Sequence, residues 1–452
     1  MNVGEAEHKV VVVMKTLTLI TSARGLQRIY QKNIRHVEKS LLILGSIDMV
    51  EKMFSRLKKI IKIYKHFMCS KWVWAWPRRS RVLIFDACNQ EILLNYLRPW
   101  RPEMLHVRGE QVNLRLLLSA FFKGGRLVDT YLDCFIEKVK PHLIVTFIDN
   151  NWHFYTISKR HPEVKTLFVQ NGWRDYYNDI FEKLENLDPS ILDKFFVDYM
   201  LLFGPVVGEK YARYLKGDIV SVGSAKNNLL RKEMVTQRGV LAFVSQYNEG
   251  GVYIAGKFYT SEDFIGQFDR LIIQSLVRYA ENQNKRFVII PRNQRGSELR
   301  IREEAYFNST AAGEPEYLNP KGFYPGYPAV DLAEVVVSVD STLGYESIAR
   351  GNKTAIFSIR SSLPGALPPL TYGWPADFPD EGPFWTNNPD PDSFIRILDY
   401  LFEVGDVQWR KDLEDTNFSS LMVYDSENSA LQTILEKELG PPPETENTSS
   451  LI

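Results

Sequence analysis

Residues 335–346 read VVVSVDSTLGYE, an apolar run followed by a small polar cluster and the start of a helix. Short apolar runs that end in turn residues are typical of buried parallel strands. Asp340 or Ser341 can cap the helix that follows, and the free amides of its first turn then favour an anion beyond the end of the strand. The segment therefore predicts one strand–loop–helix unit of an α/β fold, with an anion-binding turn.

The same alternation of strands and helices recurs on both sides of this segment. Apolar runs that predict strands lie at residues 81–86, 103–107, 143–148, 165–169, 199–203 and 218–222, and then at 240–244, 287–290, 335–339 and 354–358. Helices are expected between them, including a long one at 261–282 with Ser261 as its N-cap. The pattern predicts an α/β fold of two Rossmann-like parallel-sheet domains that face a cleft.

The domain limits follow from changes in composition along the chain. We expect a basic helical N-terminal extension at residues 1–80, a first Rossmann-like domain at 81–230 and a second at 238–438. The tail at 440–452, GPPPETENTSSLI, has the composition of a disordered segment. A chain of 452 residues is long enough for two domains.

Charge is distributed unevenly, although 55 basic and 55 acidic side chains cancel over the whole chain. Residues 1–81 hold 17 Lys and Arg against 5 Asp and Glu. Within this segment, residues 49–76 are expected to form a helix, because apolar side chains recur at helical spacing and lysines lie among them. The last part of this range contains Trp72, Trp74 and Trp76. Such a helix suits peripheral contact with an anionic membrane through residues 49–79; the alternative is a packed helix whose lysines face water. We expect no nucleic-acid partner.

Several classes of protein are disfavoured by what the sequence lacks. The three cysteines form no CxxC pair, which fits a reducing compartment and predicts a cytoplasmic protein, with the inner face of the cytoplasmic membrane as a further site. The seven histidines are scattered and no DxD motif follows a strand, so no metal is expected. The absence of a GxxxxGK[ST] loop and of GxGxxG argues against an ATPase and a dehydrogenase, and no cofactor is expected.

The ends of the second domain's strands carry the residues expected to bind a nucleotide-sugar donor. Hydroxyls, amide nitrogens and an arginine at these ends suit phosphate, and a carboxylate one turn into the helix suits ribose hydroxyls. The donor-binding candidates are Ser245, Gln246, Arg292, Asn293, Asp340, Ser341, Thr342, Leu343, Gly344 and Glu346, with Ser224 at the crossover between the domains. For residues 340–346 the alternative is an ordinary capped helix with Glu346 in a capping box. For Arg292 the alternative is a surface arginine, and for Ser224 it is a linker turn.

Polar residues also follow two strands of the first domain. Those expected to bind the sugar or the acceptor are Asn150, Asn151, Gln170, Asn171, Gly172 and Arg174. A carboxylate at the end of a strand can act as a base or a nucleophile in a transfer reaction, and Asp149 and Asp175 are the catalytic candidates. The alternative is plain turn chemistry, because Asn, Asp and Gly are the usual residues of tight turns.

Several of these segments resemble a known group of proteins. DSTLGYE at 340–346 is similar to the donor-site segment of GT-B glycosyltransferases that build surface carbohydrates. FIDNN at 147–151, VQNGWR at 169–174, VGSAKN at 222–227 and FVSQ at 243–246 resemble a bacterial family of O-antigen or surface-carbohydrate biosynthesis proteins. The resemblance covers about residues 80–435, and it extends more distantly to retaining Kdo transferases and CDP-glycerol glycerophosphotransferases.

The resemblance implies a metal-independent glycosyltransferase. Its donor would be a nucleotide-sugar, with CMP-Kdo as the example, and its acceptor a surface polysaccharide such as that of lipopolysaccharide, or a lipid-linked oligosaccharide. Asn171 and Arg292 stand where the distant relatives often carry other residues, so catalytic roles do not transfer from them. Two other hypotheses stay open, namely a non-catalytic nucleotide-binding or scaffold protein of a polysaccharide assembly complex, and a UDP-sugar epimerase.

Overall fold

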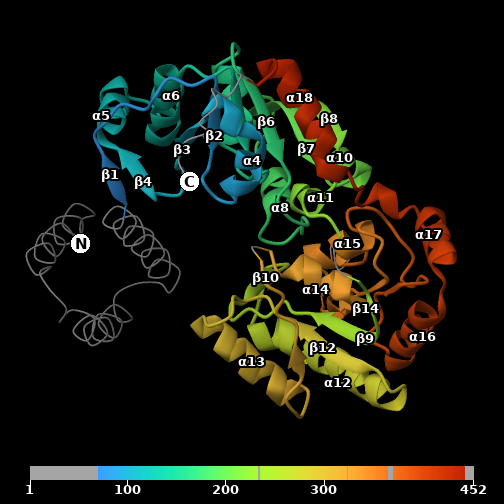
Figure 1. Ribbon diagram of the computed structural model, residues 1–452. Helices are drawn as coiled ribbons and strands as arrows, with labels where there is room; N and C mark the ends of the chain where they lie inside the picture. Colours follow the sequence, from blue (N-terminus) through green and yellow to red (C-terminus); the bar gives the residue numbers. More distant parts are fainter. Residues whose placement is uncertain (1–69, 233–234, 323, 365–369, 443–452) are drawn as a thin grey trace, which may run out of the picture. The chain divides into compact units, whose positions relative to one another are not determined.

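The computed structural model describes residues 70–232, 235–322, 324–364 and 370–442. Contacts divide the chain into one unit of residues 1–72 and 109–112 and a second of residues 73–108 and 113–452. The second unit contains two six-stranded sheets, and neighbouring strands in both are parallel (Figure 1). The prediction of an α/β fold with two Rossmann-like parallel sheets is confirmed.

The first sheet has the strand order β3-β2-β5-β6-β7-β8. Its strands are β2 (Val82–Phe85), β3 (Glu103–Leu105), β5 (Leu143–Thr146), β6 (Lys165–Val169), β7 (Phe196–Leu202) and β8 (Lys216–Ser221). The helices between them are α4 (Gln90–Leu97), α5 (Leu114–Lys123), α6 (Leu127–Val139), α7 (Ile157–Arg160), α8 (Ile180–Glu185), α9 (Pro189–Leu192), α10 (Pro205–Ala212) and α11 (Ala225–Leu229). Every residue of β2 and β5 is buried, which explains why these strands are continuous apolar runs.

The second sheet has the order β13-β12-β9-β14-β15-β16. Its strands are β9 (Gln237–Val244), β12 (Arg286–Ile290), β13 (Glu316–Tyr317), β14 (Ala333–Ser338), β15 (Thr354–Phe357) and β16 (Trp385–Thr386). Its helices are α12 (Gln267–Asn282), α13 (Glu298–Thr310), α14 (Gly326–Leu332), α15 (Thr342–Ala349), α16 (Pro391–Glu403) and α17 (Asp406–Asp415). Strand order reverses between β9 and β14, the point at which open α/β sheets usually bind ligands.

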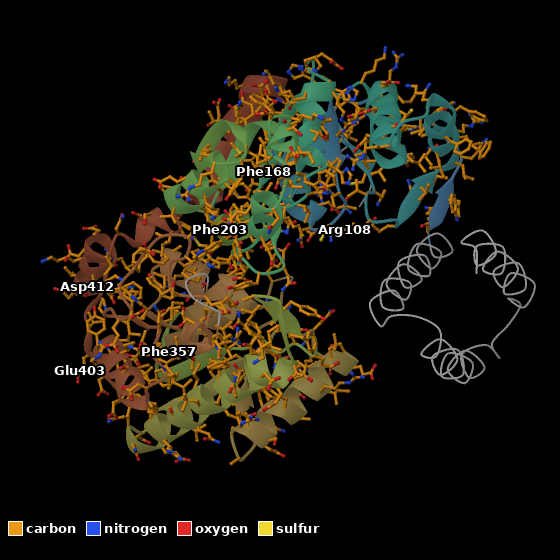
Figure 2. The ribbon with its side chains drawn as sticks, turned by 180° about the vertical axis from the view of Figure 1, so that it is seen from behind. Arg108, Phe168, Phe203, Phe357, Glu403 and Asp412 are labelled. Atoms are coloured by element: carbon orange, nitrogen blue, oxygen red, sulfur yellow. The ribbon has the colours of Figure 1, made fainter. Side chains whose placement is uncertain are left out.

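The last helix, α18 (Ser429–Leu439), packs on the first sheet, although sequence analysis placed its residues with the second domain. Its buried Leu431 and Leu435 join the cluster that contains Val145 and Leu167, and Figure 1 shows this red helix beside β7 and β8. The apolar stripe of α18 covers a face of the first sheet that would otherwise be open to water. Large aromatic side chains such as Phe168, Phe203 and Phe357 fill the cores around both sheets (Figure 2).

Local predictions differ from the structure at three places. The helix expected at 49–76 falls mainly outside the described residues, but Lys71–Val73 forms strand β1, which pairs with β4 (Gln111–Asn113). The long helix begins with a π-helical turn, Glu262–Gly266, and Ser261 makes no capping bond because its hydroxyl donates to the Asn248 carbonyl. A short antiparallel hairpin of β10 (Val252–Ile254) and β11 (Lys257–Tyr259) was not expected.

No helix in the described part of the chain is long and apolar enough to span a membrane.

Candidate functional site

The loops that follow β9 and β14 meet at the point where the strand order of the second sheet reverses. The Gln246 Nε2 donates to Asp340 Oδ1 over 2.5 Å, so two predicted residues lie in contact. Arg360, which follows β15, donates from Nη1 to both of them, at 2.8 Å to Gln246 Oε1 and 3.0 Å to Asp340 Oδ1. Arg360 is buried and makes an ion pair with buried Asp269 at 3.6 Å. Sequence analysis missed Arg360 because it lies in a turn with no recognisable motif.

A buried carboxylate holds the loops after β9 and β12. Glu303 of α13 accepts the Ser245 hydroxyl, the Arg292 amide at 2.8 Å and the Asn293 amide at 3.0 Å. Ser245 and Asn293 are therefore engaged with protein, and Glu303 is a second residue that sequence analysis missed. The Arg292 side chain is exposed and makes only long bonds of 3.3–3.4 Å to backbone carbonyls, so it is the predicted group best placed to meet an anion.

The first turn of α15 contacts the loop after β6. Thr342 Oγ1 accepts the Trp173 amide at 2.9 Å, and the Trp173 and Tyr345 rings stack with centroids 3.7 Å apart. Ser341 is the N-cap residue, but its side chain makes no capping bond. Its hydroxyl and the first amides of α15 are therefore available to a ligand, and the binding of a donor there stays a prediction.

The remaining predicted residues of α15 face protein. A Cβ added at Gly344 would lie 2.5 Å from the Ser338 Cβ of β14, so this glycine permits close helix–strand packing. Leu343 packs against the core beside Gly326.

Glu346 is buried and accepts hydrogen bonds from the Ser224 hydroxyl and from Tyr327 at 2.9 Å. Burial raises the pKa of the Glu346 carboxyl above its usual value. In the structure Glu346 and Ser224 therefore join α15 to the crossover loop, and Glu346 is not directed at open space as a ribose ligand would be.

Arg174 organises the polar loop after β6. Its guanidinium donates to Asn171 Oδ1 at 2.5 Å and to Asp179 at 3.1 Å, and it lies 3.3 Å from Asp149 Oδ2. Burial would lower the pKa of Arg174, but the Asp149 and Asp179 carboxylates raise it above its usual value. A buried and fully paired guanidinium has little capacity left for a ligand, so these contacts favour a structural role for the predicted acceptor residues Asn171 and Arg174.

The other predicted residues around this loop are also held by protein groups. Gln170 bridges the Phe203 amide and the Gly172 carbonyl, each at 2.9 Å. Asn150 donates to Asp179 at 3.1 Å, and Asn151 accepts the His153 amide at 3.1 Å.

The two candidate catalytic carboxylates have opposite environments. Asp149 is wholly buried and accepts the Tyr211 hydroxyl at 2.7 Å and the Asn171 amide at 3.2 Å; burial raises its pKa. Asp175 is exposed and accepts no hydrogen bond that fixes it. Desolvation of the Asp175 carboxyl by the surrounding protein raises its pKa to about 7, and the negative charges of Asp340 and Asp179 contribute to this rise. Of the two residues, Asp175 has the exposed surface, although the protein around it desolvates its carboxyl.

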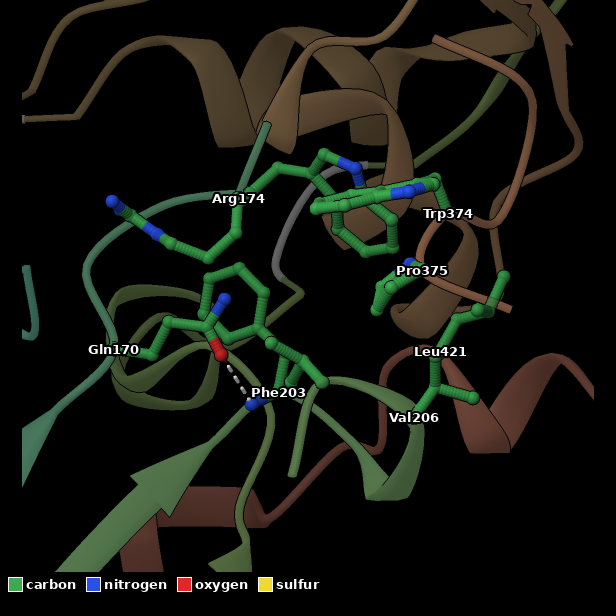
Figure 3. Close-up of a pocket in the computed structure, with 9 residues that line it drawn as sticks. Gln170, Arg174, Phe203, Val206, Trp374, Pro375 and Leu421 are labelled. Carbon is green, nitrogen blue, oxygen red and sulfur yellow. Dashed lines mark hydrogen bonds between the residues drawn. The ribbon is translucent and has the colours of Figure 1, made fainter. Parts of the chain in front are cut away.

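A small pocket lies beside the same loop (Figure 3). Its lining is mostly apolar and includes Trp173, Phe203, Val206, Val207, Trp374, Pro375 and Leu421, with Gln170 and Arg174 at its polar side. Among the described residues, no group of three or more His, Cys, Asp and Glu side chains is arranged to hold a metal ion. The prediction that no metal or cofactor takes part stays a prediction.

Comparison with known proteins shows the family. A family model described as "putative O-antigen biosynthesis protein" matches residues 167–439. The chain belongs to this family. The match includes most of β6, the loop after it and the whole second sheet. It confirms the resemblance to O-antigen biosynthesis proteins. No protein with a curated description matches.

Solved structures resemble the fold at low sequence identity. The wall teichoic acid polymerase TagF is 9% identical, with a TM-score of 0.46 over 87% of this chain and 98% of that one. The UDP-GlcNAc 2-epimerase of Methanocaldococcus jannaschii is 10% identical, with a TM-score of 0.45 over 79% of this chain and 99% of that one. The UDP-GlcNAc 2-epimerase of Neisseria meningitidis is also 10% identical, with a TM-score of 0.42 over 79% and 98%.

Proposed function

We propose that this protein is a glycosyltransferase of O-antigen biosynthesis, which moves a sugar from a nucleotide-sugar to a surface-polysaccharide or lipid-linked acceptor. Family membership supports the pathway class. The observation that carries the proposal is the contact between the loop after β6, which holds Asp175, and the first turn of α15, through the Trp173–Thr342 hydrogen bond and the stacked Trp173 and Tyr345 rings. Desolvation and the charges of Asp340 and Asp179 raise the pKa of Asp175 to about 7. Perturbed carboxylates at such positions are candidates for acid–base catalysis.

The donor nucleotide is proposed to bind at the carboxyl ends of β9, β12 and β14. The first amides of α15 with the Ser341 hydroxyl, and the exposed Arg292 guanidinium, would hold the phosphate and stabilise the charge on the departing nucleotide. The contacts among Gln246, Asp340 and Arg360 fix the floor of this site. A CMP-sugar such as CMP-Kdo is the first donor to test, because of the resemblance to Kdo transferases.

Asp175 is proposed as the catalytic carboxylate. At neutral pH a group with a pKa of about 7 is partly ionised and can take a proton from an acceptor hydroxyl as that oxygen attacks the sugar. Asp149 would act indirectly, because it positions the Arg174 guanidinium and the Asn171 amide that shape the loop before Asp175. We propose a metal-independent reaction at the cytoplasmic face of the membrane, where a lipid-linked acceptor would be available.

The test is a transfer assay with candidate nucleotide-sugars and an O-antigen-type lipid-linked acceptor. We expect Asp175→Asn to lower kcat by roughly 100-fold or more, since loss of a general base typically costs this much. The matched control is Asp193→Asn, which changes an exposed carboxylate at the end of α9. An unchanged kcat in Asp175→Asn would remove Asp175 from the reaction. Nucleotide binding without transfer in the wild type would favour the scaffold hypothesis, and conversion of the donor without acceptor would favour an epimerase.

A further inference from the structure

The hairpin of α5 and α6 carries an exposed apolar surface away from the candidate site. This α5–α6 patch consists of Leu118, Phe121, Phe122, Leu127 and Val128. Phe122 is 82% exposed and Phe121 69%, and every residue from 121 to 128 is exposed. Figure 1 shows α5 and α6 side by side, and the two helices contact each other. Two adjacent phenylalanines in water are costly, so this surface calls for a partner.

The patch results from the helical spacing of α5. Leu116 and Ala120 face the core, whereas Leu118, Phe121 and Phe122 lie at i, i+3 and i+4 on another face. The turn at Gly124 and Gly125 has positive φ angles of 75° and 85°. The turn joins α5 to α6, so the exposed Leu127 and Val128 follow the two phenylalanines within six residues.

Exposed tryptophans and basic side chains occur beside the hairpin. Trp74 is 54% exposed and Trp76 45%. The Arg115 guanidinium of α5 lies 5.4 and 5.3 Å from their ring centroids, and the Lys138 ammonium of α6 lies 4.3 Å from that of Trp76. These cations connect the tryptophans to the helices of the patch.

The charges on the hairpin leave an excess of cations. Lys123 pairs with Glu137 at 2.6 Å and Arg126 with Asp129 at 3.5 Å. Arg115 and Lys138 lie over the tryptophan rings, and the third carboxylate of the hairpin, Asp133, pairs with Arg160 and His161. Residues 114–139 therefore carry four basic and three acidic side chains, a net charge of +1. Long basic side chains that alternate with Phe, Leu and Trp can extend to lipid headgroups while the apolar groups enter the acyl region.

We propose that the α5–α6 patch, together with Trp74 and Trp76, binds an anionic lipid membrane. The excess of cations and the flanking tryptophans favour a lipid surface over an apolar protein partner, because tryptophan prefers the boundary between water and lipid. The whole surface lies within the described residues. Trp74 and Trp76 belong to the segment 49–79 that the sequence predicts as a membrane contact, whereas the α5–α6 patch was not predicted. The proposal does not depend on the glycosyltransferase assignment.

The test measures binding of the full chain to vesicles of phosphatidylcholine alone and of phosphatidylcholine with phosphatidylglycerol. We expect the wild type to sediment with the anionic vesicles and the double variant Phe121→Ser/Phe122→Ser to bind them roughly tenfold or more weakly, as the loss of two inserted aromatic rings implies. The matched control is Ile301→Ser/Val407→Ser, which changes two residues that are 64% and 84% exposed elsewhere. The control should bind as the wild type does.

A second measurement distinguishes insertion of this patch from binding by another segment. On anionic vesicles the emission of a fluorophore attached at Phe122→Cys should shift to the blue and be quenched by nitroxide-labelled lipid. A fluorophore attached at Ile301→Cys should show neither change. Labelled wild type gives the background signal from the native cysteines. Unquenched fluorescence at position 122 on bound protein would overturn the proposal. Equal binding of the wild type and the Phe121→Ser/Phe122→Ser variant to anionic vesicles would also overturn the proposal. If that variant bound vesicles normally but no longer associated with other copies of the chain, the patch would be a contact between copies, and the proposal would be overturned.

Discussion

At the scale of single residues, burial separates groups that look alike in the sequence. Asp149 and Asp175 both follow strands of the first sheet, yet one is wholly buried among donors and the other is exposed beside a second carboxylate. The sequence could identify both as candidates because of their place at strand ends. It could not rank them, because the burial of Asp149 depends on Tyr211 and Arg174, which approach from elsewhere in the fold.

The raised pKa of Asp175 predicts a dependence of stability on pH. A carboxyl whose pKa is about 7 in the folded protein and about 3.9 when unfolded binds more protons in the folded state between these values. Ionisation of Asp175 therefore lowers the free energy of unfolding as pH rises from about 4 to about 7. We expect Asp175→Asn to raise Tm at pH 8 and to leave it nearly unchanged at pH 4, measured by thermal unfolding. An equal shift at both pH values would contradict the assigned ionisation.

The pairing of Arg174 predicts a large structural effect. Arg174→Ala would leave Asp149 and Asp179 without their cation, and loss of one partner of a buried ion pair typically costs about 3–5 kcal/mol. Urea denaturation measures this loss. Arg292→Ala is the control, and as an exposed side chain it should change stability by less than about 0.5 kcal/mol. If Arg174→Ala kept wild-type stability and lost only affinity for a ligand, the binding role expected from the sequence would be right.

At the scale of elements, the strands were the most predictable features. All of β5, and β6 from Thr166 onward, are buried, and polar residues follow each strand. The limits predicted from the sequence differ from the observed ones by two residues or fewer. β1 and the β10–β11 hairpin were missed because each is three residues long and is stabilised by pairing rather than by its own apolar pattern. Arg360 and Glu303 were missed for a related reason, since Arg360 bonds Gln246 and Glu303 bonds Ser245, both far away along the chain.

The contact between α15 and β14 gives a prediction for a glycine. Gly344→Ala would place a Cβ 2.5 Å from the Ser338 side chain, and overpacking of this kind costs about 1–3 kcal/mol. The double variant Ser338→Gly/Gly344→Ala lacks the Ser338 side chain that the new Cβ would meet. Its loss in the free energy of unfolding should therefore be smaller than the sum of the losses in the two single variants. A double-mutant cycle by chemical denaturation measures the coupling. Additive losses would mean that the two positions do not meet.

At the scale of the whole molecule, several contacts join the regions around the two sheets. The stacked Trp173 and Tyr345 rings and the Ser224–Glu346 hydrogen bond connect loops of the first sheet to α15. The chain also returns through α18 to the first sheet. The sequence predicted two Rossmann-like halves, but it could not show that Glu346, expected at the nucleotide, instead supports the connection between them. Such contacts depend on how separate segments pack, which no local pattern records.

A thermal shift with CMP, CDP, UDP, GDP and ADP tests most directly whether a nucleotide-sugar binds at the carboxyl ends of the second sheet's strands. A ligand at about 100 times its Kd should add roughly 2.7 kcal/mol to the free energy of unfolding. We expect one nucleotide to raise Tm, with the shift greatly reduced in Arg292→Ala and kept in the exposed control Arg213→Ala. CMP would indicate an acid sugar such as Kdo as the donor. No shift with any of the five nucleotides, or a shift that Arg292→Ala leaves intact, would contradict the proposed donor site.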